Sequence, residues 1–372
     1  LFRDDRFIEI AAILRKEIHE EGEKTKLARE DRAIVLAAVQ QNGLALQYAS
    51  EELKKDREIV LKAVQQNDAA LQYVPEEFKA DREFMLTAVQ LNEFALEHAS
   101  DKLKNDYEIV LTAVKQGGTA LEDASEDLKR NKEIVLAAVE QNGFALQCAS
   151  KELQADKKIV SAAVQQDGLA LGYASEELQN DREIVLEAVK QNGFALEYAL
   201  PRLRNDRKIV LAAVQQSEEA LMYASGNLKT DKEFILEAVG RNGLALQYVS
   251  EGFKDDIEIV SAAVQQNGLA LQYASEELKK DREIVLKAVQ QNDAALQYVP
   301  EEFKADREFM LTAVQLNEFA LEHASPELKA DIVKISNFKA FIISPIAQTG
   351  RFSSSSSSSS PPNGTKKKLL NL

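Results

Sequence analysis

Apolar and polar residues follow one pattern that repeats every 25 residues along most of the chain. In the first copy, which begins at Asp31, the apolar residues are Ile34, Val35, Ala38 and Val39. Residues with this spacing lie on one face of a helix, and the positions between them lie on the opposite face. Each copy is therefore predicted to open with an amphipathic helix of about ten residues.

The residues at the two ends of this helix support the same prediction. Asp31 comes directly before it, and an aspartate there accepts hydrogen bonds from the free N–H groups of the first turn. Asn42-Gly43 comes directly after it. Because asparagine and glycine tolerate left-handed backbone, we expect this pair to end the helix in a left-handed conformation.

The second half of the copy is predicted to be two short helical pieces. Ala and Leu recur in every copy at its fifteenth and sixteenth positions, as in Ala45-Leu46. Pro75 and Pro201 occupy the twentieth and twenty-first positions of later copies, where a continuous helix would not accept proline. The final piece begins at Ser50-Glu51-Glu52-Leu53, which resembles a cap followed by an acidic first turn.

Twelve ungapped copies fill residues 31–330, and we number the positions of each unit from its first residue. The later units begin at Asp56, Asp81, Asp106, Asn131, Asp156, Asp181, Asp206, Asp231, Asp256, Asp281 and Asp306. A fixed period of this length predicts an all-α fold, a superhelical α-solenoid in which each unit is ordered by its neighbours. Residues 37–100 are identical to residues 262–325, which indicates an internal duplication of whole units.

The ends of the chain depart from the repeat. Residues 1–30 match its opening only in part and are interpreted as a degenerate N-terminal capping unit. Residues 331–349 lose the spacing and are predicted to be a C-terminal cap or linker. Residues 350–372 contain eight consecutive serines and three lysines, and this low-complexity composition predicts a disordered tail.

Charge and composition narrow the classes of partner. The net charge is −15, so the chain repels phosphate backbones, and we expect no nucleic-acid partner. No apolar run approaches the roughly 18 residues of a membrane span, and we expect no membrane partner. The single cysteine, Cys148, excludes an intramolecular disulfide and is compatible with a reducing compartment, so a cytoplasmic location is expected.

Side chains that could act in catalysis or bind a metal are interpreted as structural. Position 18 is usually Tyr, and its replacement by His98, Asp123, Cys148 and His323 is typical of a half-exposed packing position. The histidines are too far apart along an elongated array to share a metal. Paired carboxylates recur at helix starts, where the helix dipole accounts for them. We therefore predict no catalytic residue, no cofactor and no metal.

Two sets of polar residues are candidates for recognition. Glutamines at positions 10 and 11, such as Gln40 and Gln41, are interpreted as an inter-unit hydrogen-bond ladder or a solvated edge, with a ligand-binding ladder as the alternative. Positions 3, 7 and 10 vary in charge on the exposed side of the first helix, which suits a recognition surface but also neutral drift. This candidate partner-contact stripe consists of Glu58, Lys62, Gln65, Lys158, Lys208 and Glu237.

Four blocks of the unit, D-R-E-I-V-L, Q-N-G, A-L-Q-Y-A-S and E-E-L-K, resemble the repeat family called domain of unknown function 4116. The likeness covers residues 31–330. It implies a helical array and no established activity. Asn131 in place of Asp, Ser161 in place of Leu and Leu200-Pro201 in place of Ser-Glu depart from the pattern.

The sequence favours a non-catalytic scaffold for protein–protein interaction that binds an unknown protein or extended peptide along its length. It makes no prediction of oligomeric state. The alternative is a recruitment or spacer region of a larger enzyme or effector, since the chain starts at Leu1 without Met and a catalytic part is expected, on that view, to precede it. Reading of single-stranded RNA by one unit per base is disfavoured by the acidic charge.

Overall fold

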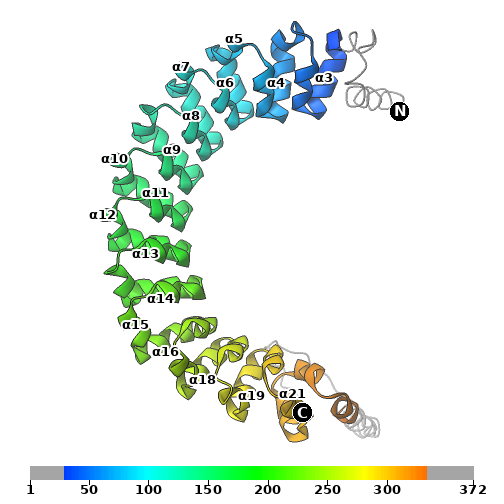
Figure 1. Ribbon diagram of the computed structural model, residues 1–372, viewed down its shortest axis with the longest axis vertical. Helices are drawn as coiled ribbons and strands as arrows, with labels where there is room; N and C mark the ends of the chain where they lie inside the picture. Colours follow the sequence, from blue (N-terminus) through cyan, green and yellow to red (C-terminus); the bar gives the residue numbers. More distant parts are fainter. Residues whose placement is uncertain (1–28, 333–372) are drawn as a thin grey trace, which may run out of the picture.

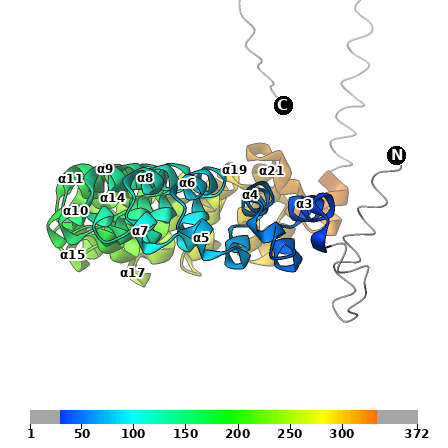
Figure 2. The same ribbon diagram turned by 90° about the horizontal axis from the view of Figure 1, so that it is seen from above.

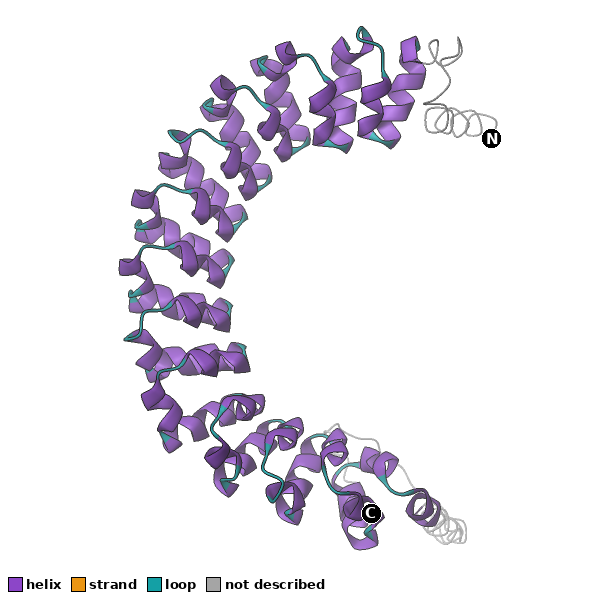
Figure 3. Cartoon of the chain, in the orientation of Figure 1, coloured by secondary structure: helices purple, strands orange, loops and turns teal. Residues whose placement is uncertain are grey.

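The computed structural model describes residues 29–332, and every regular element in that range is a helix. The helices stack side by side along a wide arc (Figures 1 and 3). The tail predicted for residues 350–372, and nearly all of the predicted N-terminal and C-terminal caps, lie outside the described residues. No helix within the described range is long and apolar enough to cross a membrane.

A ten-residue α-helix opens each 25-residue segment, as predicted. Its bounds are α3 (Arg32–Gln41), α4 (Arg57–Gln66), α6 (Arg82–Leu91), α8 (Tyr107–Gln116), α9 (Lys132–Gln141), α11 (Lys157–Gln166), α13 (Arg182–Gln191), α14 (Arg207–Gln216), α16 (Lys232–Arg241), α18 (Ile257–Gln266), α19 (Arg282–Gln291) and α21 (Arg307–Leu316). The apolar face of each helix turns toward its neighbours, which leaves its charged positions in water.

A six-residue 3₁₀-helix follows each α-helix. These are η1 (Gly43–Tyr48), η3 (Asp68–Tyr73), η4 (Glu93–His98), η5 (Gly118–Asp123), η7 (Gly143–Cys148), η8 (Gly168–Tyr173), η9 (Gly193–Tyr198), η11 (Glu218–Tyr223), η12 (Gly243–Tyr248), η13 (Gly268–Tyr273), η15 (Asp293–Tyr298) and η16 (Glu318–His323). Position 19 then adopts extended backbone, as Ala49 does, so the two short pieces predicted for this half are confirmed.

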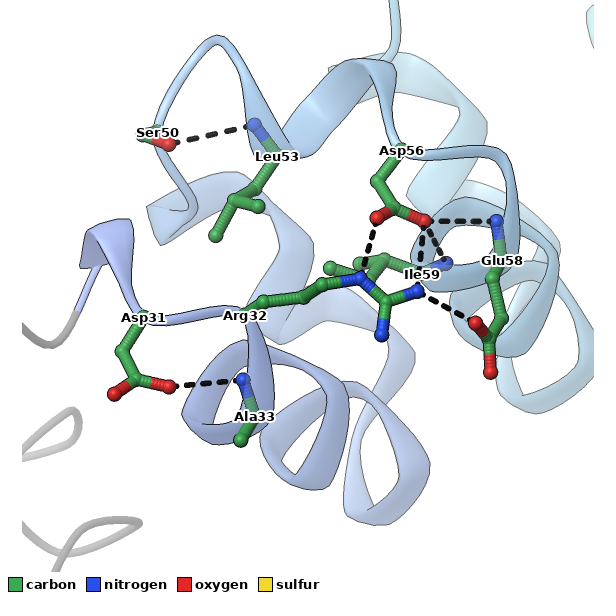
Figure 4. Close-up of polar contacts among 8 residues, drawn as sticks. All are labelled: Asp31, Arg32, Ala33, Ser50, Leu53, Asp56, Glu58 and Ile59. Carbon is green, nitrogen blue, oxygen red and sulfur yellow. Dashed lines mark hydrogen bonds and ion pairs between the residues drawn. The ribbon is translucent and has the colours of Figure 1, made fainter.

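A single helical turn closes the segment and leads into the next aspartate. These turns are η2 (Leu53–Lys55), α5 (Glu76–Lys79), α7 (Asp101–Lys104), η6 (Leu128–Arg130), α10 (Lys151–Gln154), α12 (Glu176–Gln179), η10 (Leu203–Asn205), α15 (Gly226–Thr230), α17 (Glu251–Lys254), η14 (Leu278–Lys280) and α20 (Glu301–Ala305). Several are capped by the serine before them; Ser50 Oγ, for instance, accepts from the N–H of Leu53 at 3.3 Å (Figure 4).

The predicted N-terminal cap of the ten-residue helix is confirmed. Asp31 Oδ1 accepts from the backbone N–H groups of Ala33 at 2.9 Å and Ile34 at 3.2 Å. The predicted left-handed end is wrong, because Asn42 has φ −149° and ψ 108°, which is extended backbone. Asn42 Oδ1 accepts from the N–H of Leu44, so one asparagine ends the α-helix and caps the 3₁₀-helix that follows.

Glycine at position 13 serves the contact between units and not the turn. A Cβ on Gly43 would lie 2.3 Å from the carbonyl oxygen of Ala63, which belongs to the next unit, and one on Gly168 would lie 2.3 Å from that of Ala188. The acidic residues found at this position in other units require a different approach of the neighbouring backbone. Those residues are Asp68, Glu93, Glu218, Asp293 and Glu318.

The helices form two layers with the core between them. Each ten-residue helix packs on its neighbours in one layer, and each 3₁₀-helix packs on its neighbours in the other. The short helices α5, α7, α10 and α12 lie on the outer side of the arc, and the ten-residue helices α6, α8, α9 and α11 line one side of the band in Figure 2. The one-residue turn at position 12 therefore faces the inner edge (Figure 3).

The core is continuous from Val35 to Ile332. In the second unit its members include Ile59, Ala63 and Leu71, whose side chains have no exposed surface. Since each of these residues is covered partly by the unit before and partly by the unit after, the burial of one unit depends on both neighbours.

Candidate protein-interaction surface

Cations at position 2 join most units to the next. Arg32 Nε lies 2.7 Å from Asp56 Oδ2 and Arg32 Nη2 lies 2.5 Å from Glu58 Oε2, both in the following unit (Figure 4). Lys157 contacts Asp181 at 2.9 Å in the same way. Hydrogen bonding to Asp56 raises the pKa of the Arg32 guanidinium, and the same bond lowers the pKa of Asp56. The aspartate that caps a helix is thus also the acceptor for the preceding unit.

A backbone hydrogen bond forms a second link between units. At most junctions the N–H at position 20 donates to the carbonyl oxygen at position 24 of the preceding unit, as in Ser100 to Lys79 at 2.9 Å and Ser275 to Lys254 at 2.8 Å. Pro75 occupies position 20 in the second unit and has no N–H to donate. The prolines therefore mark junctions where this link is absent.

The junction between the units that begin at Asp256 and Asp281 lacks both links. Ile257 occupies position 2, where all other units except the fourth, which has Tyr107, have Arg or Lys, and its side chain is 61% exposed. Pro300 replaces the position-20 donor in the following unit. A direct contact remains between Lys287 Nζ and Ser261 Oγ at 3.0 Å, together with the packing of α18 on α19.

The charged stripe predicted on the ten-residue helices is exposed, and several of its members bind neighbours in the same array. Glu58 pairs with Arg32, Lys62 donates to Gln65 at 3.3 Å, and Glu237 Oε1 lies 2.8 Å from Arg241 Nη2. Lys158 and Lys208 are exposed on α11 and α14. Contact of this stripe with a partner stays a prediction.

The position-11 glutamines cross between units in two places, as the ladder interpretation expects. Gln166 Nε2 donates to the carbonyl oxygen of Gln141 at 3.0 Å, and Gln266 Oε1 accepts from the N–H of Gly243 at 2.6 Å. Gln40, Gln41 and Gln66 are exposed. The glutamines therefore form inter-unit hydrogen bonds at some junctions and lie in a solvated edge at others.

Six large exposed apolar side chains lie on the 3₁₀-helices, and two more, Leu91 and Leu316, end the ten-residue helices that precede them. We call this set the apolar row, and its members occupy positions 11, 14, 17 and 18. They are Leu91, Phe94, Phe144, Phe194, Tyr198, Met222, Leu316 and Phe319. Phe94 is 48% exposed and Phe319 is 59% exposed. Phe94, Phe144 and Phe194 are each the second residue of a 3₁₀-helix, directly after the turn at the inner edge of the arc.

Glutamates are interleaved with this row. In a 3₁₀-helix residues i and i+3 share a face, so Phe94 is beside Glu97 and Phe194 is beside Glu197. Glu97 and Glu197 are exposed. The surface therefore offers apolar contacts flanked by negative charge, and sequence analysis missed it because position 14 was not identified as exposed.

A groove of 440 Å³ opens on the same layer. Its lining includes Gln147, Gly172 and Tyr173, and Phe144 packs edge-on against Tyr173 with ring centroids 6.0 Å apart. Most units have Gln or Glu at position 17, but a Cβ on Gly172 would lie 3.0 Å from the ring of Tyr198, so the glycine lets this tyrosine of the next unit approach closely. The groove lies between the fifth and sixth units and adjoins the apolar row.

Position 18 is half-buried, as predicted, in every unit except the seventh, where Tyr198 is exposed. Burial raises the pKa of the Cys148 thiol and that of the Asp123 carboxyl, so neither has the environment of an activated nucleophile. His98 differs, because it approaches Asp68 of the preceding unit. Sequence analysis compared the histidines only with one another and overlooked this pair. The sequence does contain a signal for this pair: Asp replaces Gly at position 13 of one unit, and His occupies position 18 of the next.

The repeat matches one known family. The sequence profile described as domain of unknown function (DUF4116) matches six consecutive segments: 31–79, 81–129, 131–179, 181–229, 231–279 and 281–329. The chain belongs to this family. Each DUF4116 match spans two 25-residue units, and Phe94, Phe144 and Phe194 occupy the same place in three successive matches. No curated protein matches the chain.

Proposed function

We propose that residues 31–330 form one superhelical α-solenoid of twelve 25-residue repeats that serves as a non-catalytic scaffold. Its partner is an extended protein segment that carries apolar side chains and basic residues, and the apolar row is the contact surface. The observation that carries the proposal is the concentration of exposed apolar side chains on the 3₁₀-helices and on the ends of the ten-residue helices that lead into them. Exposed apolar patches on folded proteins commonly mark sites of protein interaction.

The distribution of these side chains supports this choice of surface. Of the ten large exposed apolar side chains in residues 29–332, eight belong to the apolar row. The other two, Tyr107 and Ile257, occupy position 2, at the opposite end of the ten-residue helix from position 11. By contrast, the charged stripe on the ten-residue helices has polar neighbours of its own, such as Arg32 for Glu58.

Spacing and charge specify the partner further. Phe94, Phe144 and Phe194 recur every second unit, which corresponds to about 16–20 Å if neighbouring helices pack at about 8–10 Å. An extended peptide rises about 3.3 Å per residue, so its apolar anchors are expected about five or six residues apart. Lysine or arginine between the anchors complements Glu97, Glu197 and the net charge of −15.

The test uses defined peptides and the full chain. Fluorescently labelled 20-residue peptides with Phe or Leu every five or six residues and Lys between them are titrated with the protein, and binding is measured by anisotropy. The triple variant F94T/F144T/F194T should bind at least tenfold more weakly. Thr119 occupies the same position in the fourth unit, so this replacement is compatible with the fold.

The matched control lies on the other layer. The variant K62A/K158A/K208A removes three lysines of the charged stripe and should leave binding of the peptides unchanged. If this variant loses binding of the peptides and the phenylalanine variant does not, the charged stripe is the contact surface and the apolar row is not. Failure of every peptide in the series to bind the wild-type protein would contradict the proposal.

A further inference from the structure

Three ligating side chains meet at the junction of the second and third units. Asp68 is the first residue of η3, and Glu97 and His98 are the last two residues of η4. One carboxylate oxygen from each acid and one ring nitrogen of His98 all lie within 4.8 Å of one another. His98 Nε2 lies 3.6 Å from Asp68 Oδ2.

The histidine nitrogen in this group has no hydrogen-bond partner. His98 Nε2 is shielded from solvent and makes no hydrogen bond, although the histidine side chain as a whole is still 12% exposed. A buried polar atom without a partner is unfavourable, and such atoms are rare in folded proteins. This nitrogen lies close to both carboxylates, so one ion placed between the three side chains could contact all of them.

We propose that Asp68, Glu97 and His98 bind one divalent transition-metal ion, with Zn²⁺ the best fit. Zn²⁺ accepts imidazole nitrogen and carboxylate oxygen at about 2.0–2.2 Å, and tetrahedral ligands are then about 3.3 Å apart. The 3.6 Å approach of His98 to Asp68 is close to that separation. Water supplies the fourth ligand, because Glu97 is exposed and keeps the site open.

The bound ion joins two units. Asp68 belongs to the second unit, whereas Glu97 and His98 belong to the third, so coordination adds a link across their junction. Metal that binds only the folded array stabilises it by mass action. Pro75 precludes the position-20 backbone link to the first unit, so the second unit depends more heavily on its other neighbour.

The duplication supplies an internal comparison. Asp293, Glu322 and His323 repeat the same residues near the other end of the array, but there His323 Nε2 lies 3.1 Å from Asp293 Oδ2 and shares a hydrogen bond with it. An ion must displace that hydrogen bond before it coordinates His323. The second site is therefore expected to bind more weakly than the first.

The experiment titrates Zn²⁺ into the full chain by calorimetry, after removal of bound metals with a chelator. Two binding events of unequal affinity are expected. H98Y should remove the tighter event, with at least a tenfold loss of affinity, and H98Y/H323Y should remove both. Tyr fills position 18 in eight other units, so these variants are expected to fold. Co²⁺ should give the intense visible absorption of a tetrahedral site in the wild type and not in the double variant.

Two further measurements separate this site from a general affinity of acidic surfaces for cations. E122Q changes a glutamate at the same unit position as Glu97 in the next unit, and should leave zinc binding unchanged. Zinc should raise the melting temperature of the wild type and not that of H98Y/H323Y. Equal zinc binding by the wild type and H98Y/H323Y, or no binding by the wild type, would overturn the proposal. Peptide binding by the apolar row is measured separately, so either proposal can fail alone.

Discussion

Arg32 and Asp56 belong to different units and yet share one polar centre. Arg32 Nε contacts Asp56 Oδ2 at 2.7 Å, while Asp56 Oδ1 accepts from the N–H groups of Glu58 at 3.0 Å and Ile59 at 3.2 Å. One carboxylate thus starts its own helix and holds the unit before it. This coupling explains why Asp is found at position 1 in eleven of the twelve segments.

Substitution at Asp156 separates these two roles. D156N is expected to keep the cap, because Asn131 accepts the same two backbone hydrogen bonds at 3.0 and 3.2 Å, but it loses the ion pair with Lys132. D156A loses both and should be less stable than D156N by about 1 kcal/mol, the typical effect of a lost cap. Urea unfolding followed by circular dichroism measures the difference. Equal stability of the two variants would contradict the dual role.

The same carboxylates predict sensitivity to acid. Hydrogen bonds from Arg32, Arg82 and Lys132 hold the pKa values of Asp56, Asp106 and Asp156 below their usual range. Because the folded pKa lies below the unfolded value of about 3.9, this stabilisation is complete above about pH 4 and is lost as the pH falls through the folded pKa.

Thermal unfolding at a series of pH values checks this expectation. The contribution of these three groups should be constant from pH 7 to 5, so the melting temperature of the wild type should fall more steeply below pH 4 than that of D56N/D106N/D156N. Parallel curves for the two proteins across the whole range would show that these aspartates do not govern acid unfolding.

Two glycines should respond oppositely to alanine. G168A places a Cβ 2.3 Å from the carbonyl oxygen of Ala188, so the junction must shift, and a loss of about 1–3 kcal/mol is expected for such overpacking. G240A is the control, since no atom lies within 4 Å of the added Cβ and the residue is inside α16. It should gain about 0.5–1 kcal/mol. Denaturant midpoints measure both, and equal effects would contradict the close approach at Gly168.

Cys148 should react slowly as a thiol. Burial raises its pKa, so less thiolate is present at neutral pH than for an exposed cysteine. Alkylation by iodoacetamide at pH 7.5, followed by mass spectrometry, should be several-fold slower in the folded protein than in urea, with free glutathione as the reference. A folded-state rate equal to that of glutathione would contradict this assignment.

The junction after Ile257 should be the easiest to open. I257R restores a cation facing Asp281, in the arrangement that Arg32 and Asp56 adopt, and P300S restores a backbone donor. Each is expected to slow hydrogen exchange at the start of α19, and their combination should slow it most. The start of α13 is the reference, because its junction has both links. If hydrogen exchange in the wild type is as slow at the start of α19 as at the start of α13, the prediction is wrong.

Periodicity predicted the features that depend on neighbouring residues in the chain. Ile59 and Val60 define a helical face by their spacing, and Asp31 caps the helix that follows it directly. Contacts such as Arg32 with Asp56, or Asp68 with His98, depend on how one unit stacks on the next, which spacing alone does not determine. The exposure of Phe94 was missed for a related reason, because the periodicity did not indicate that its segment is a 3₁₀-helix.

Head-to-tail pairing also bears on how the array changes length. Every complete unit carries an acceptor for the unit before it and, in most cases, a donor for the unit after it, so an inserted or deleted whole number of units restores matching partners at the new boundary. The identical stretches 37–100 and 262–325 fit such an event. Recombination can therefore lengthen or shorten the gene in steps of 75 bases without any new interface having to evolve.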